Sequence, residues 1–236
     1  MITAKIFPER QRHISRLAEI MGFSFEYVSK YDADALEPDD LKLVSDQLSP
    51  ASVSNVLKHL EAQRMFLRTA NDCALIFEDD VILFEQFFLN LSLVLSDAAM
   101  LRPGWLIFLG GADNKIDARF ARSSNICLIE KPMTTAEAYL VDRKSCQMRV
   151  KWLRKNIIDR QADHQLKQMD SQLGITHYCV SHPMATQGSI LGLFKTSLDK
   201  SRAKHISAYL RLRFEYNRFR RQTIPRAWEK LKKRFF

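Results

Sequence analysis

Short apolar runs alternate along this chain with longer segments of helical periodicity, and this alternation is the feature that most restricts the fold. It is typical of α/β proteins, in which helices connect the strands of one sheet and cover its faces. Strands are predicted at residues 3–7, 25–28, 73–77, 105–109, 126–129, 138–141 and 176–180. The 236 residues suffice for one compact domain, or for one domain with an appendage.

Three helices are predicted between these strands, each burying one face against the sheet. The clearest begins at Pro50, with Ser49 as its N-cap, and runs to about Ala70. The next two are marked by apolar residues three or four apart: Cys146, Val150, Leu153 and Ile157 in one, and Ala162, Leu166, Met169 and Leu173 in the other, which ends near Gly174. A further helix is expected from about Leu83.

Composition excludes several classes of protein. Hydrophobic residues make up 46% of the chain and charged residues 27%, which is a globular rather than a disordered balance. No apolar run reaches the ~20 residues that a membrane-spanning helix needs, and the first residues lack the apolar core of a secretory signal. The four cysteines are far apart in the sequence, which favours reduced thiols and a cytoplasmic location.

The positive charge is concentrated at the C-terminal end. Residues 195–236 hold 14 of the 36 Lys and Arg residues but only three of the 27 Asp and Glu residues. The remaining 22 basic and 24 acidic residues nearly balance in the preceding part. We therefore expect a catalytic body at 1–197 and a basic amphipathic helical segment at 198–236, with Pro225 dividing the segment into two pieces.

Three interpretations of this segment are open. Its apolar residues alternate with arginines, so it can lie on an anionic membrane surface with the arginines near lipid headgroups. Alternatively, its apolar side packs on the body while the arginines face water. In a nucleic-acid-binding protein, the arginines would neutralise phosphates and the aromatic rings would stack on bases. That third interpretation leaves the acidic residues of the body unexplained, so no nucleic-acid partner is expected.

The chemistry is expected where the apolar strand 73–77 is followed at once by Glu78, Asp79 and Asp80. Ligands of open α/β sheets bind beyond the carboxyl ends of the strands. Adjacent carboxylates repel one another there unless a cation or solvent lies among them, and oxygen ligands suit Mg²⁺ or Mn²⁺. The alternative is a solvated acidic turn before the next helix.

At these residues the sequence resembles glycosyltransferase family 25, which includes bacterial lipooligosaccharide galactosyltransferases and collagen-modifying relatives. Glu78-Asp79-Asp80-Val81 is similar to the family's Glu-Asp-Asp-Val strand end. Six further landmarks follow the family's order over residues 8–197: Pro8-Glu9-Arg10-Gln11-Arg12-His13-Ile14, Gly22-Phe23-Ser24-Phe25-Glu26-Tyr27, Leu48-Ser49-Pro50 with His59-Leu60, Ala136-Glu137-Ala138-Tyr139-Leu140-Val141, Ala162-Asp163-His164-Gln165-Leu166, and His182-Pro183 with Gln187-Gly188-Ser189. Only the acidic block is fairly specific by itself, so their order carries the resemblance.

The resemblance implies a single GT-A-like, Rossmann-type domain, a UDP-sugar donor and a divalent ion, Mn²⁺ or Mg²⁺. Glu78 and Asp80 are then the expected metal ligands, directly or through water, and Asp79 orients the donor sugar. Asp163 is the expected catalytic base, which an inverting attack by an acceptor hydroxyl requires, or else a further residue of the metal site. The alternative is an Asp in the first turn of a helix, where the helix dipole favours negative charge.

Three further residues are expected to bind the donor. Arg10 lies in the early helix start, His59 lies in the helix that begins at Pro50, and Gly111 follows the strand 105–109. His59 is at the flank of the apolar stripe of its helix, so the alternative for it is a half-buried structural histidine. The pair Gly110-Gly111 permits close backbone approach to a ligand, although a plain turn also accounts for it.

The expected function is transfer of a hexose, most simply galactose, to a lipid-linked lipopolysaccharide or lipooligosaccharide core. The enzyme would then act at the inner face of the bacterial inner membrane. Two departures from the family favour an alternative, a catalytically weakened relative: only seven residues precede Pro8, where the family has a longer nucleotide-holding segment, and Lys58 occupies a position where serine is common. A metal-dependent phosphoesterase is a third possibility, but the sequence has no histidine-rich ligand set.

Overall fold

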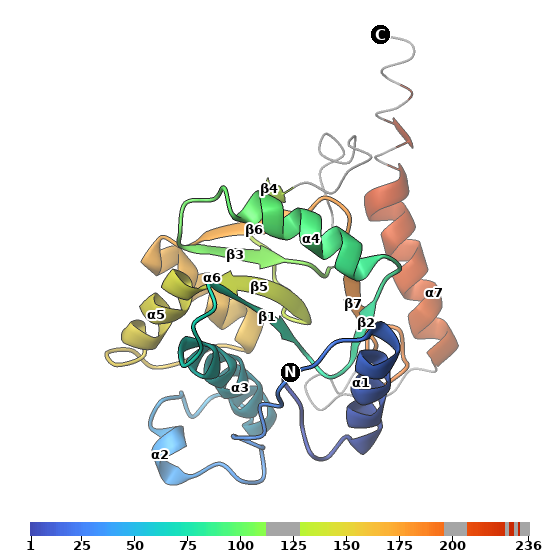
Figure 1. Cartoon of the computed structure of the whole chain (residues 1–236). Helices are drawn as coiled ribbons and strands as arrows, with labels where there is room; N and C mark the ends of the chain where they lie inside the picture. The colour runs from blue at the N-terminus through green and yellow to red at the C-terminus, as the bar shows by residue number, and fades with distance from the viewer. Residues whose placement is uncertain (112–127, 196–206, 225–226, 229–230, 232–236) are drawn as a thin grey trace.

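The computed structural model describes residues 1–111, 128–195, 207–224, 227–228 and 231 of the chain (Figure 1). Its centre is a five-stranded sheet in the order β1 (Cys73–Phe77), β5 (Ala138–Asp142), β3 (Trp105–Phe108), β6 (Thr176–Val180) and β4 (Leu128–Glu130). Only β3 and β6 are parallel, and the other three neighbouring pairs are antiparallel. The expected α/β class is confirmed. The strands predicted at 73–77 and 176–180 have the predicted bounds, whereas part of the strand predicted at 126–129 lies outside the described residues.

A separate antiparallel pair joins β2 (Val81–Leu83) and β7 (Ala185–Gln187). Neither strand was predicted from the sequence, and a helix was expected from about Leu83. That expectation was wrong, because Val81 to Leu83 continue the chain in extended form, and α4 begins only at Phe87 (Phe87–Ala98). This pairing places Gln187 opposite Val81, directly after the acidic block.

The strands predicted at 3–7 and 25–28 were also wrong. Ile2 alone forms parallel bridges to Val28 and Glu78, and its amide donates to the Phe77 carbonyl at 2.8 Å. After Thr3 the chain turns into α1 (Pro8–Met21), in which Pro8 occupies the first helical position. Ile2 therefore lies between Glu78, at the end of β1, and Val28, with one bridge to each.

The remaining helices follow their local signals closely. The Oγ of Ser49 accepts from the Ser52 amide and caps α3 (Pro50–Leu67). Asp142 caps the N-terminus of α5 (Arg143–Trp152) in the same way. This helix ends at Trp152, with Leu153 as its C-cap, so the predicted continuation to Ile157 was wrong. α6 (Ala162–Leu173) has the predicted bounds, and a short helix, α2 (Pro38–Leu41), lies on the loop before α3.

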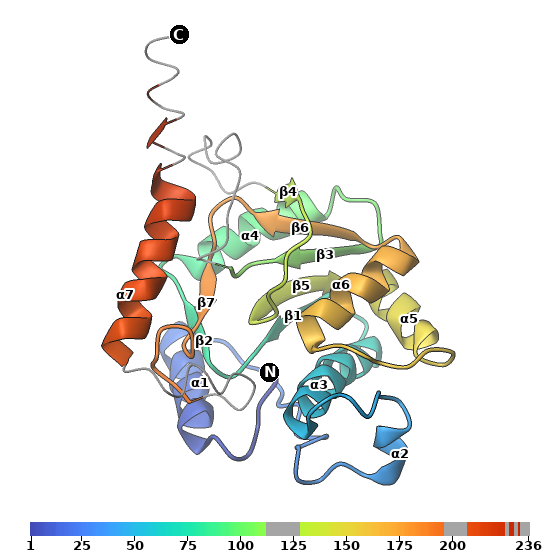
Figure 2. The ribbon, with the colours of Figure 1, turned by 180° about the vertical axis from the view of Figure 1, so that it is seen from behind.

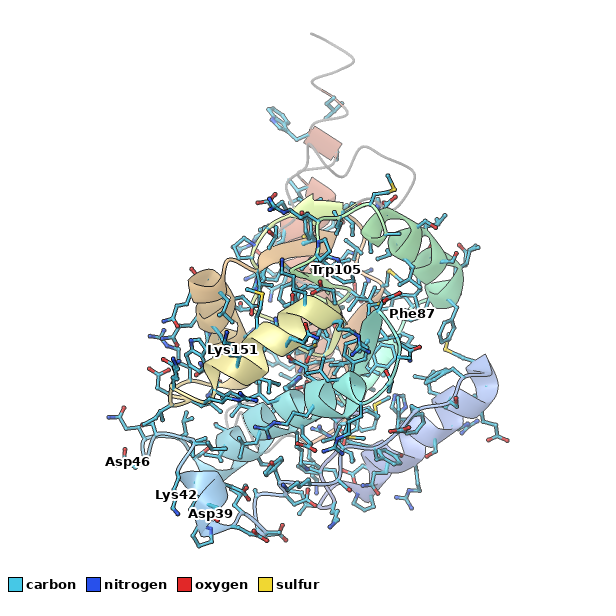
Figure 3. The ribbon with its side chains drawn as sticks, turned by 60° about the vertical axis from the view of Figure 1, so that its left-hand side comes forward. Asp39, Lys42, Asp46, Phe87, Trp105 and Lys151 are labelled. Atoms are coloured by element: carbon cyan, nitrogen blue, oxygen red, sulfur yellow. The ribbon has the colours of Figure 1, made fainter. Side chains whose placement is uncertain are left out.

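The sheet lies between two helical layers. Alternate residues of β3 point to opposite faces: Leu106 and Phe108 join the core under α3, α5 and α6, whereas Trp105 and Ile107 join the core under α1 and α4. Figure 2 shows α3, α5 and α6 together on one face of the sheet. Phe87, which has no exposed surface, lies with Trp105 in the other core (Figure 3).

The basic segment contains α7 (Ser207–Arg218), which continues into a π-helical turn at Phe219–Thr223. In Figures 1 and 2, α7 lies at the edge of the molecule next to β2 and β7. Among the described residues, no helix combines the length and the apolar character that crossing a bilayer requires.

Candidate active site

A pocket of about 760 Å³ opens at the carboxyl end of β1. Its walls come from the N-terminal segment, α1, α3, the acidic block, residues 134–137, the start of α6 and the segment after β7. The described charged residues that line it are mostly acidic: Asp32, Asp34, Glu78, Asp79, Asp80, Glu137 and Asp163 face Arg10 and Lys58. An anionic ligand such as a nucleotide diphosphate therefore needs extra positive charge to bind here.

Three side chains hold the Glu78 carboxylate. Asn55 Nδ2 and His59 Nε2 lie 3.3 Å from Oε1, and Gln187 Nε2 donates to Oε2 at 2.6 Å. Burial alone would raise the pKa of Glu78, but these hydrogen bonds outweigh it and hold the pKa below its usual value. Glu78 is therefore an ionised carboxylate in a fixed orientation.

Arg10 links α1 to the other two carboxylates of the block. Its Nη1 donates to Asp79 Oδ1 at 3.1 Å and lies 3.8 Å from Asp80 Oδ2. The Ala4 amide donates to the second oxygen of Asp79 at 3.2 Å. Burial raises the pKa of Asp79 and of Asp80, and the Arg10 guanidinium opposes that rise. Each carboxylate oxygen of Asp79 thus accepts a hydrogen bond from the protein.

One carboxylate oxygen of Asp80 accepts a hydrogen bond from the protein, and the other accepts none. The segment after β7 binds it twice: the Gly188 amide donates to its carbonyl at 2.7 Å, and the Ser189 amide donates to Oδ2 at 3.2 Å. Its Oδ1 is buried and has no hydrogen-bond partner. A buried carboxylate oxygen without a donor is costly, and a cation would offset that cost.

These carboxylates fit a divalent cation in part. Asp80 offers a vacant oxygen in an acidic pocket, and carboxylate oxygen is the ligand that Mg²⁺ and Mn²⁺ prefer. Within the described ranges, however, no three His, Cys, Asp or Glu side chains are grouped closely enough to hold a metal. Since both oxygens of Glu78 accept hydrogen bonds, the geometry favours Asp80 as a direct ligand and contact through water for Glu78.

His59 does not reach the pocket, contrary to its predicted contact with the donor. Its imidazole has no exposed surface and lies between the Tyr139 hydroxyl, at 2.9 Å from Nδ1, and Glu78. His59 lies at the edge of the apolar stripe of α3, and because this stripe faces the sheet, the imidazole is buried there. His59 therefore positions Glu78 from behind.

Gly111 lines the pocket, but its amide already has a partner. It donates to Glu137 Oε1 at 2.6 Å, and the Thr135 hydroxyl donates to Oε2. A Cβ added at Gly110 would lie 2.5 Å from Glu137 Cδ, so the side chain fits only because Gly110 has none. Gly110 and Gly111 thus make room for the Glu137 carboxyl group and bind it, whereas the sequence predicted a ligand contact or a turn at these glycines.

Glu137 is the main residue of the site that sequence analysis missed. It is 2% exposed and lines the pocket, and burial, with the negative charges of Glu78 and Asp80, raises its pKa to about 8. The group is therefore mostly protonated at neutral pH. In the sequence it was part of the landmark at 136–141 and lay directly before the apolar strand 138–141, and neither feature distinguishes a site residue from a solvated strand end.

The sequence also did not reveal the roles of buried Lys58 and half-buried Asn55. Lys58 Nζ donates to the Thr3 carbonyl and lies 2.5 Å from Asp32 Oδ1, so it closes the pocket floor with a buried ion pair. Asn55 lies one helical turn before His59 and shares its partner Glu78. The spacing of Asn55 and His59 on one face of α3 was the available signal.

Asp163 lies on the wall of the pocket formed by the start of α6. It is half-buried, and its Oδ1 accepts from the His164 amide at 2.8 Å. Within the part of the chain that the structure describes, it makes no ion pair. The pocket thus brings together every predicted site residue except His59, with Asp163 provided by a different element from the acidic block.

Neither a scan against protein-family models nor a search of curated proteins finds a match for this chain.

Proposed function

We propose that this chain is a glycosyltransferase that moves a hexose, most simply galactose, from a UDP-sugar to a lipopolysaccharide or lipooligosaccharide core. The observation that carries the proposal is the vacant, buried oxygen of Asp80 in an acidic pocket at the end of β1. The mixed sheet with its acidic block at a strand end is compatible with a GT-A-like fold. The proposed place of action is the inner face of the bacterial inner membrane.

The acidic block would bind and orient the donor. A divalent cation, Mn²⁺ or Mg²⁺, would neutralise the charge that develops on the departing diphosphate. Asp80 would hold this ion, and Glu78 would stay fixed by His59 and Gln187 so that its charge faces the same region. The hydrogen bond from Arg10 fixes the Asp79 carboxylate, which would then orient the donor sugar.

Two carboxyl groups outside the block would control protons. Asp163 is on a separate wall and is half-exposed, so it can accept the proton of an acceptor hydroxyl. Glu137 keeps its own proton at neutral pH, because its pKa is about 8. It therefore lines the pocket without adding a further negative charge.

The test is a panel of UDP-sugars assayed for UDP release with and without Mn²⁺, together with calorimetry of UDP binding. We expect release from one donor, dependence on the ion, and loss of ion-dependent UDP binding in Asp80→Asn. Asp39→Asn is the matched control, because Asp39 is exposed on α2 (Figure 3) and does not line the pocket. Ion-dependent UDP binding that is unchanged in Asp80→Asn would contradict the proposed role of Asp80.

A further inference from the structure

The helix α7 has two apolar faces rather than one. Leu210 and Phe214 are buried, at 7% and 3% exposure, and so account for the side of the helix that faces the body. Leu212, Tyr216 and Phe219 are 71%, 61% and 54% exposed. At 3.6 residues per turn these three residues share one face, and the buried pair lies on the opposite face. Packing on the body therefore accounts for only one of the two apolar faces.

Exposed arginines lie on both sides of the outer face. By helical spacing, Arg211 and Arg218 lie along one edge of the Leu212-Tyr216-Phe219 stripe, and Arg213 and Arg220 lie along the other. Glu215 is the only acidic residue in the described part of the helix, and it lies 3.1 Å from Arg218. A central apolar stripe between two rows of cations is the pattern of a helix that lies in a membrane interface.

We infer that the outer face of α7 docks on an anionic lipid bilayer, with Leu212, Tyr216 and Phe219 inserted between headgroups and the arginines in contact with them. The charge supports this occupant, because residues 195–236 carry 14 basic residues against three acidic ones. The same charge opposes docking of a second copy, since two such helices repel each other. A nucleic acid would use the arginines but would leave the aliphatic Leu212 facing phosphates and water.

The inference does not depend on the proposed function, because a chain without transferase activity would bind vesicles in the same way. If both hold, they complement each other. In Figures 1 and 2, α7 lies next to β2 and β7. β2 begins directly after Asp80, and β7 ends at Gln187. A bilayer on the outer face of α7 would then lie on the same side of the molecule as β2 and β7, which adjoin the pocket residues Asp80 and Gln187.

The experiment is flotation of the full chain with vesicles of phosphatidylcholine alone and of phosphatidylcholine with a quarter phosphatidylglycerol. We expect binding to the anionic vesicles that is about tenfold or more tighter than to the neutral ones, and that weakens as salt rises. Leu212→Ser with Phe219→Ser should reduce binding about tenfold, and Arg211→Gln with Arg213→Gln should reduce it by a similar factor. All four side chains are exposed, so circular dichroism should show the same fold as the wild type.

Ile157→Ser is the matched control, because Ile157 is 60% exposed and lies outside α7. Its vesicle binding should equal that of the wild type. Three results would overturn the inference: no flotation with anionic vesicles, serine variants that bind as tightly as wild type, or equal loss in the control. Salt-sensitive binding of single-stranded RNA without vesicle binding, or a dimer that Leu212→Ser dissociates, would likewise replace the bilayer with a different occupant.

Discussion

Glu137 lies against the backbone of Gly110, so closely that a methyl group on Gly110 would stand 2.5 Å from its carboxyl carbon and 2.9 Å from its Cγ. The Gly111 amide then holds the same carboxyl group at 2.6 Å. These contacts join the end of β3 to the start of β5 at the pocket, and they make the glycine pair and Glu137 one structural unit.

Gly110→Ala should destabilise the protein by about 2 kcal/mol, because the new methyl group must displace the buried Glu137 side chain. In a Glu137→Ala background the same substitution should cost much less, since the clashing atoms are gone. Chemical denaturation of the two single variants and the double variant measures this coupling. Additive effects would show that Glu137 does not lie against Gly110 as observed.

Glu137→Gln should change the pH dependence of stability in metal-free protein. The pKa of Glu137 is about 8 in the folded state and 4.5 is its ordinary value, so between these limits the folded wild type holds a proton that the unfolded chain has lost. Wild-type stability should therefore fall relative to Glu137→Gln as pH rises from about 4.5 to about 8, by about 1.4 kcal/mol per unit. The N-terminal amine, whose pKa is lowered to about 6 by burial, acts in the opposite direction but is common to both proteins. Parallel urea titrations across this range measure the difference, and a constant difference would contradict an elevated pKa.

Arg10→Gln should destabilise the protein more at pH 7.5 than at pH 5. The guanidinium opposes the burial that raises the pKa of Asp79 and Asp80, so without it both carboxyl groups bind protons more tightly in the folded state. The variant therefore loses stability as pH rises through these raised pKa values. Arg10→Lys keeps the charge and should recover part of the loss. Thermal unfolding at the two pH values provides the readout, and an equal loss at both would argue against this charge coupling.

Asp170→Asn should destabilise the protein by about 3–5 kcal/mol, because Arg149 would remain as a buried cation without its carboxylate. Arg149 has no exposed surface, and its Nε and Nη2 contact the two oxygens of Asp170 at 2.7 and 2.5 Å. The arginine holds the pKa of Asp170 below its usual value despite burial. By contrast, Lys42→Met removes the exposed pair with Asp39 and should have no measurable effect. Comparable denaturation midpoints for both variants would contradict the assigned burial.

Local signals in the sequence determined much of the framework. Apolar runs bounded by polar residues located β1 and β6, and the cap at Ser49 with Pro50 located α3, because these signals act within a few neighbouring residues. The acidic block after β1 was likewise readable, since three carboxylates directly after a buried strand have few explanations. Those residues do line the pocket.

The tertiary structure alone decided which side chains meet. Strands β2 and β7 are each three residues long, too short for a periodic pattern, and exist because they pair with each other. Their pairing brings Gln187 to Glu78 across 109 residues of sequence. Glu137 has its elevated pKa only because the sheet buries it near two other carboxylates. Burial and long-range hydrogen bonding depend on the whole folded chain, and no short stretch of sequence encodes them.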